Sequence, residues 1–186
     1  EWFINLTPLN LSVSFFLLVY LNKNHLKTII FIFSCFFIGM ISEILGVNFG
    51  VIFGDYDYGK ALGYKFFGVP LLIGANWAIL TVSCAALTAT LFDSLIIKVI
   101  MGVFLMVMLD AVIEPIAPIL DFWEFDGGKA PLKNYLGWII VAFPLNCTYH
   151  ILNIKVNGNF THHLIILNIL FFSILLLQLN TLKNLI

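Results

Sequence analysis

The chain is poor in charge and contains no arginine. Only 10% of its 186 residues are charged, and nine lysines against ten acidic residues give a formal net charge of −1. Nucleic-acid binding needs a basic surface that neutralises phosphates, and bidentate recognition of anions needs the guanidinium group of arginine. Both are missing, so the composition excludes a nucleic-acid-binding protein.

Motifs for metal or cofactor binding are also scarce. Cys35, Cys84 and Cys147 stand singly in apolar runs without CxxC spacing, which predicts buried small side chains and not a redox or zinc site. A membrane di-iron oxygenase needs several histidine boxes, but only His162 and His163 are adjacent. We therefore expect neither a metal ion nor an organic cofactor.

Two phosphate-binding patterns are incomplete. Asp55 and Asp57 form a DxD pair of the kind that holds Mg²⁺ on a diphosphate. A prenyltransferase would add a second acidic motif and basic clamps, which this arginine-free chain lacks. The glycine-rich stretch 54–63 contains no GxxxxGK[ST] motif, so it predicts turns and not a phosphate-binding loop.

What the sequence does have is apolar length. Hydrophobic residues make up 61% of the chain, the mean hydropathy is +1.04, and continuous apolar runs are typical of helices that cross a bilayer. The sequence predicts an all-α, polytopic transmembrane helical bundle forming one domain over residues 1–186. Because residue 1 is Glu and not Met, a further span before it is left open. Six spans are expected, at 2–21, 28–47, 70–91, 95–119, 135–152 and 161–180.

The two long connections, 48–69 and 120–134, are expected on the same membrane face. Spans two and four both end there, and spans three and five both begin there; we call this face B and the opposite one face A. Short loops on the cytoplasmic side normally carry more lysine. Here four lysines on face A oppose five on face B, which indicates no orientation.

Three acidic residues fall inside the predicted spans. A charged side chain at the bilayer centre costs about 2.5–3.5 kcal/mol on insertion scales, so Glu43, Asp110 and Glu114 are candidates for a functional site. Asp110 and Glu114 are four residues apart and share one helix face. All three lie in the half of the bundle near face B.

Other polar and aromatic residues are expected in the same half. The spans contribute Asn76, Trp77, Asn134 and Trp138, and the loops contribute Asp55, Tyr56, Tyr58, Asp121 and Trp123. The pattern predicts a polar, aromatic pocket; the alternative is an interfacial aromatic belt with solvated loop acids. Poorly hydrated carboxylates repel one another, so we expect at least one to stay protonated. Such an acid beside aromatic rings suits proton transfer to an isoprenoid double bond.

Several motifs resemble those of a known family. The segments 43–47, 53–58, 62–63 and 68–71, then Asp110, Glu114-Pro115, Trp123 with Phe125, and 134–138, are similar to the carotenoid biosynthesis membrane-protein family. This family includes CruF-type carotenoid 1,2-hydratases, such as bisanhydrobacterioruberin hydratases, of bacteria and archaea. Glu114 stands where the family more often has Asp, and Phe125 replaces a second Trp. The resemblance implies hydration of the ψ-end of an acyclic carotenoid without an organic cofactor, in the cytoplasmic membrane of a prokaryote.

Three hypotheses follow. In the first, a hydratase, Asp110 or Glu114 protonates the terminal alkene, and Glu43 or Asp55 orients the water that adds to the cation. The remaining candidates would bind the substrate, shield the cation or hold the carboxylates, namely Tyr56, Tyr58, Asn76, Trp77, Asp121, Trp123, Asn134 and Trp138. The second hypothesis is a carotenoid end-group cyclase, and the third is a proton-coupled carrier or lipid-binding protein. The expected partners are an acyclic carotenoid and the lipid bilayer; the sequence indicates no oligomeric state.

Overall fold

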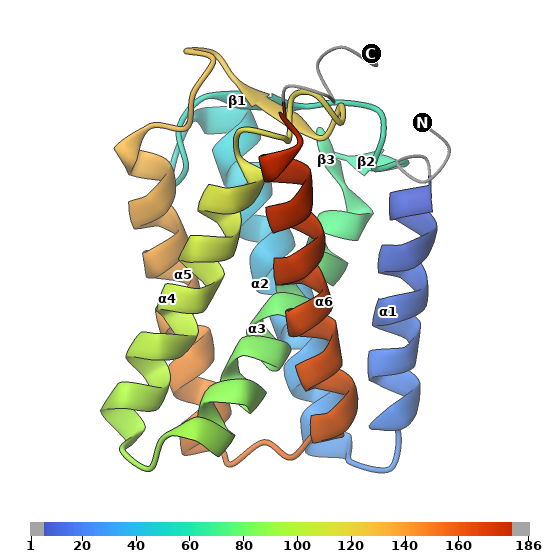
Figure 1. The fold of residues 1–186 in the computed structure, drawn as a ribbon, viewed down its shortest axis with the longest axis vertical. Coiled ribbons are helices and arrows are strands. Elements are labelled where there is room, and N and C mark those ends of the chain that lie inside the picture. Colours follow the sequence, from blue (N-terminus) through green and yellow to red (C-terminus); the bar gives the residue numbers. More distant parts are fainter. Residues whose placement is uncertain (1–5, 180–186) are drawn as a thin grey trace.

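The computed structural model describes residues 6–179, which form six helices arranged side by side with alternating direction (Figure 1). The all-α fold is confirmed, with four short strands added in the loops. The helices are α1 (Thr7–Leu21), α2 (Leu26–Phe49), α3 (Leu71–Leu91), α4 (Leu95–Ile113), α5 (Leu132–Ile151) and α6 (Gly158–Leu177). The strands are β1 (Tyr56–Tyr58), β2 (Lys65–Phe66), β3 (Val69–Pro70) and β4 (Trp123–Phe125).

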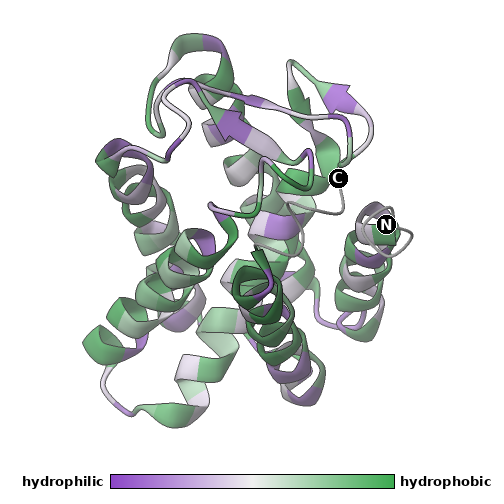
Figure 2. Ribbon diagram, turned by 45° about the horizontal axis from the view of Figure 1, so that its top comes forward, coloured by the Kyte–Doolittle hydropathy of each residue, from purple (hydrophilic) through white to green (hydrophobic). Residues whose placement is uncertain are grey.

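The helices have the surface of a membrane protein. Among the described residues, four helices, α2, α3, α4 and α6, are long and apolar enough to cross a bilayer, while α1 is apolar but only 15 residues long. Large apolar side chains such as Phe16 and Ile140 are about two-thirds exposed, as in a bundle whose outer surface contacts lipid. Figure 2 shows hydrophobic helices below loops and strands that are more hydrophilic. The protein is therefore an integral membrane protein.

Both long connections lie on one face of the bundle, as predicted. Strand β1 pairs antiparallel with β4, so that Tyr56 lies opposite Phe125 and Tyr58 opposite Trp123. A second small sheet joins β2 to β3 within the first connection. The β1–β4 pair ties the two connections together into a cover over the ends of α2, α3, α4 and α5, which we call the lid (Figure 1).

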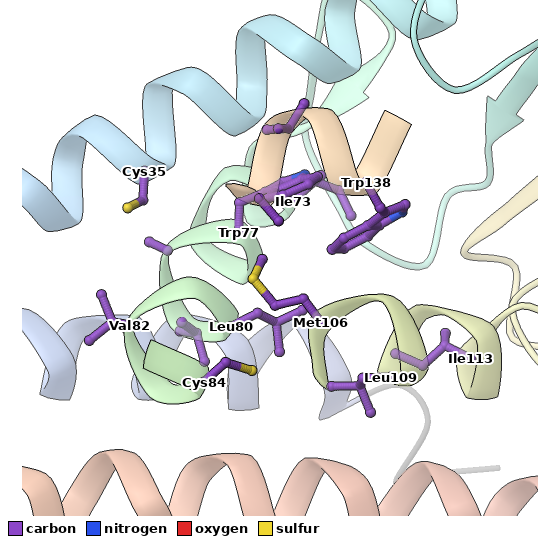
Figure 3. Close-up of a cluster of buried hydrophobic side chains, with 14 of the residues drawn as sticks. Cys35, Ile73, Trp77, Leu80, Val82, Cys84, Met106, Leu109, Ile113 and Trp138 are labelled. Carbon is purple, nitrogen blue, oxygen red and sulfur yellow. The ribbon is translucent and has the colours of Figure 1, made fainter. Parts of the chain in front are cut away.

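Helix α3 forms the centre of the bundle. It packs against all five other helices, and most of its side chains between Ile73 and Thr88 are buried. The core around it contains Trp77, Leu80, Met106 and Trp138 (Figure 3). Cys35 and Cys84 are buried in this region as free thiols, and Cys147 is half-buried, as expected for isolated cysteines.

Helix α4 is shorter than the predicted span 95–119, which was wrong at its end. The helix stops at Ile113, and turns follow as far as Asp121. Pro115 and Pro118 cause this end, because proline has no N–H group to continue the helical hydrogen bonds. Glu114 caps the helix, and its backbone N–H still donates to the carbonyl of Asp110 at 2.9 Å.

A glycine allows α2 to approach α3 closely beside Trp77. A Cβ atom placed on Gly39 would overlap the Cβ and Cγ atoms of Trp77, whereas one on Gly127 would meet nothing within 4 Å. We expect Gly39→Ala to lower the free energy of unfolding by about 1–3 kcal/mol, because a packed interface cannot take the added methyl group without shifting. Unfolding in mixed detergent micelles measures the change. Equal losses for Gly39→Ala and the control Gly127→Ala would contradict this account.

Candidate functional site

Glu43 of α2 is buried and accepts three hydrogen bonds. The hydroxyls of Tyr56 and Tyr58 donate to its Oε2 at 2.5 and 2.7 Å, and Nε1 of Trp77 donates to its Oε1 at 2.9 Å. Only 5% of the Glu43 surface is exposed. Both carboxyl oxygens are thus held by neutral donors from β1 and α3.

The strand pairing of the lid positions these donors. Side chains alternate between the two sides of a strand, so Tyr56 and Tyr58 point into the bundle while Asp57 between them is exposed. The same alternation on β4 buries Phe125 and partly buries Trp123, while Glu124 is exposed. Every aromatic side chain of the β1–β4 ladder therefore faces the bundle.

A second carboxyl cluster lies at the end of α4. Nδ2 of Asn134 donates to Oδ2 of Asp110 at 2.8 Å and to Oε1 of Glu114 at 3.2 Å. Nε1 of Trp123 also donates to Oε1 of Glu114, at 3.2 Å. Asp110 and Asn134 are each 3% exposed. One amide on α5 and one indole on β4 thus connect two acids of α4 to neighbouring elements.

Two tryptophans form one wall of the site. The rings of Trp77 and Trp138 stack with centroids 4.2 Å apart and an angle of 20° between their planes (Figure 3). Trp138 lies four residues after Asn134, so both occupy one face of α5. Phe53, which is 1% exposed, lies against Trp77 with a centroid distance of 6.2 Å.

A small cavity, which we call the chamber, lies among these side chains. Its volume is about 20 Å³, close to the space that one water molecule needs. The lining residues come from α2, α4, α5 and the lid: Glu43, Phe53, Tyr56, Tyr58, Asp110, Glu114, Trp123, Phe125, Asn134 and Trp138. A larger cavity of about 420 Å³, the vestibule, lies beside the chamber and shares Glu114, Trp123 and Phe125 with it.

The chamber balances negative charge with neutral donors. None of its lining residues is a lysine or a histidine. Burial, followed by the nearby Glu43 carboxyl, raises the pKa of the Tyr56 and Tyr58 hydroxyls well above the usual value for tyrosine. Both tyrosines therefore keep their protons and act as hydrogen-bond donors. The arrangement can hold a carboxylate, a carboxylic acid and a water molecule within one small cavity.

Most of the residues proposed from the sequence are brought together. The chamber contains three of the four catalytic candidates, Glu43, Asp110 and Glu114. Of the binding candidates, it is lined by Tyr56, Tyr58, Trp123, Asn134 and Trp138, while Trp77 reaches it through its hydrogen bond to Glu43.

Three candidates lie elsewhere. Asp55 is exposed and does not line the chamber, because it sits one residue out of phase with the inward-facing Tyr56. Asn76 lines a separate groove of about 400 Å³ between α1, α3 and α6. Asp121 is exposed, has a positive φ of 55°, and accepts a hydrogen bond from the backbone N–H of Lys60 at 2.7 Å, so it stabilises the lid.

Two chamber residues were absent from the proposed set. Phe53 and Phe125 both line the cavity and are almost completely buried. Phe125 alternates with the exposed Glu124 as Trp123 does, whereas Phe53 precedes β1 and no strand alternation points to it. Among residues 6–179, no three His, Cys, Asp or Glu side chains are arranged to hold a metal ion.

The fold and site define a helical membrane protein with a carboxyl-lined, aromatic chamber under a two-stranded lid. The family model described as carotenoid biosynthesis protein matches residues 4–184. The chain therefore belongs to this family, and its role lies in carotenoid biosynthesis. No curated protein and no solved structure matches the chain.

The hydrogen bonds to Glu43 should contribute measurably to stability. Tyr58→Phe removes a donor to a buried carboxyl, and we expect it to lower the free energy of unfolding by about 1.5–3 kcal/mol. Tyr64→Phe is the matched control, because Tyr64 is 76% exposed. Unfolding in detergent micelles measures both variants, and the loss should shrink when Tyr58→Phe is made in a Glu43→Gln background. A Tyr58→Phe protein as stable as the control would disprove the stabilising role of this contact.

Proposed function

We propose that the protein is a cofactor-independent carotenoid hydratase of the CruF type. It adds water across the C1–C2 double bond at the ψ-end of an acyclic carotenoid. The observation that carries the proposal is the chamber, which places buried carboxyls, aromatic rings and room for one water molecule in the same small cavity. The resemblance to bacterial and archaeal hydratases supports a location in the cytoplasmic membrane of a prokaryote.

Asp110 is assigned as the proton donor. Among the described side chains only Asn134 donates to Asp110, and it does so at Oδ2. Oδ1 is therefore left to carry a proton, which it transfers to C2 of the alkene while the C1–C2 π electrons form the new C–H bond. The product of this step is a tertiary cation at C1, and positioned carboxylic acids commonly perform such proton transfers.

Glu43 is assigned as the base. Three donors bind its two oxygens, whereas Asp110 has one donor, and hydrogen bonds to a carboxyl group favour its charged form. As the water oxygen bonds to C1, Glu43 takes the proton that the water loses. The proton then returns from Glu43 to Asp110, so the reaction consumes one water molecule and leaves both carboxyl groups as they began.

The aromatic rings stabilise the intermediate cation. The electron-rich faces of tryptophan, tyrosine and phenylalanine attract a positive charge, more strongly where water is scarce. Trp138, Trp123 and Phe125 line the chamber beside the carboxyls. A water molecule held in the chamber would be the nucleophile, since the cavity has space for about one.

The structure bears differently on the two other hypotheses. A cyclase must keep water from the cation, whereas this chamber has polar lining and space for a water molecule. A proton-coupled carrier needs titratable groups along a path to both faces. Here Glu43, Asp110 and Glu114 gather at one cavity near the lid, which favours a catalytic site over a path.

Loss of the proposed acid should abolish hydration. In a host that makes lycopene, the wild-type chain should yield products heavier by one water, with label from H₂¹⁸O in the hydroxyl group. Asp110→Asn should reduce the rate by at least about 100-fold, because the amide cannot donate a comparable proton. The control is Asp57→Asn in the exposed position of β1. A folded wild-type protein that leaves lycopene unchanged would rule out the hydratase, and an isomer of unchanged mass would indicate a cyclase.

Loss of the proposed base should separate protonation from water capture. In Glu43→Gln, we expect hydration to fall by about 100-fold while protonation at C2 continues and reverses. In D₂O, lycopene recovered from this variant should then carry deuterium at C2, as shown by mass spectrometry and NMR. The control is Asp57→Asn, on the exposed side of β1. Normal hydration by Glu43→Gln would remove Glu43 from the mechanism.

A further inference from the structure

The vestibule has the position of a binding cavity for the chain that reacts in the chamber. It lies between the turns after α4 and the beginning of α5, and it is about twenty times larger than the chamber. Ala111, Pro115 and Pro118 form one side, and Ala130 and Tyr135 form the other. Trp123 separates it from the chamber.

The volume of the chamber is too small for the isoprenoid chain of the substrate, so that chain must lie outside it. A space of about 20 Å³ holds one water but not a branched isoprenoid end as well. The vestibule, at about 420 Å³, lies within the range of cavities that enclose small organic ligands. An isoprenoid chain in the vestibule would place its end at the shared wall, where Glu114, Trp123 and Phe125 meet both cavities.

The walls suit a hydrocarbon better than a phosphorylated isoprenoid. The prolines and alanines are apolar, and the prolines give the wall a stiff backbone. Lys129 is the single basic residue lining the vestibule, where it is accompanied by the acids Glu114 and Glu124. A diphosphate would require more positive charge than one lysine opposed by two carboxyls supplies.

Trp123 is the less buried of the two aromatic side chains in the shared wall. It is half-buried, whereas Phe125 is 6% exposed. Its one side-chain hydrogen bond, to Oε1 of Glu114, is 3.2 Å long, and that oxygen is shared with Asn134. Rotation of this indole would break this long hydrogen bond and its ring contacts with Tyr58 and Phe122, and would open the wall between the two cavities, without a break in the β1–β4 backbone pairing.

We propose that the vestibule binds the terminal isoprene units of an uncharged isoprenoid, and that Trp123 is the gate through which the chain end reaches the chamber. This inference rests on the proposed hydratase function. It adds the place where the hydrocarbon binds, the preference for an uncharged chain, and a positioning role for one tryptophan.

Filling the vestibule tests the binding site. Ala111→Phe places a ring in the cavity without touching the chamber contacts, and Ala89→Phe makes the same change at an exposed position of α3. Initial rates in vesicles at several lycopene contents give apparent KM and kcat. We expect Ala111→Phe to raise the apparent KM about tenfold with kcat nearly unchanged, because the loss falls on substrate binding. Ala89→Phe should match the wild type.

Two further variants, at Ala130 and at Trp123, test whether misfolding could explain a change in KM. Ala130→Phe should raise the apparent KM as Ala111→Phe does, and Trp123→Phe, which lacks the N–H donor to Glu114, should change kcat in vesicles that contain saturating lycopene. Circular dichroism and detergent unfolding check that each variant folds. If the wild type hydrates lycopene, and Ala111→Phe and Ala130→Phe both have the apparent KM of the wild type, the vestibule proposal is wrong and the hydratase proposal stands. If the wild type forms no hydrated product, the hydratase proposal itself fails.

Discussion

Carboxyl groups buried in the chamber, where no lysine or histidine of residues 6–179 lines the cavity, are the constraint on which this structure depends. Such groups are costly in an apolar environment unless hydrogen-bond donors satisfy them. The donors here are all neutral, and each comes from a different element than the acid it serves. Trp77 of α3 and two tyrosines of β1 bind Glu43, while Asn134 of α5 bridges the acids at the end of α4. The acids therefore hold the lid and the helices in one arrangement.

Glycines make this arrangement sterically possible at three helix surfaces. A Cβ atom on Gly39 would overlap Trp77, one on Gly46 would lie 2.7 Å from the Tyr56 hydroxyl, and one on Gly137 would lie 2.6 Å from the carbonyl oxygen of Ile52. The first contact seats a donor to Glu43 between α2 and α3, and the other two seat the lid on α2 and α5. Close packing and hydrogen bonding are thus linked at Glu43, since Trp77 and Tyr56 lie where α2 carries a glycine.

How much of the structure can be predicted from the sequence depends on how many residues each sequence pattern spans. Long apolar runs identify the helices, and acids within them identify the half of the bundle that holds the site. The direction in which a side chain points is harder to predict. Asn76 and Trp77 are adjacent, but successive residues of a helix are rotated by about 100°. Asn76 therefore lines the groove between α1, α3 and α6, whereas Trp77 contacts Glu43. Likewise, Asp55 was expected beside Tyr56 in the site, but strand alternation exposes it. A strand of three residues is too short for its alternation to be recognised before its partner is known.

The acids differ in the number of hydrogen bonds that they accept, which supports different roles for them, as acid and as base, in the proposed reaction. Glu43 is bound by three donors, whereas Asp110 has one and shares it with Glu114. Two carboxyl groups in one cavity can act as acid and base only if their surroundings favour different protonation states. The tyrosines that create this difference belong to the same ladder as Trp123, because Tyr58 lies opposite Trp123 in the strand register. Trp123 and the tyrosine donors of Glu43 are therefore positioned by the same three residue pairs of the β1–β4 ladder.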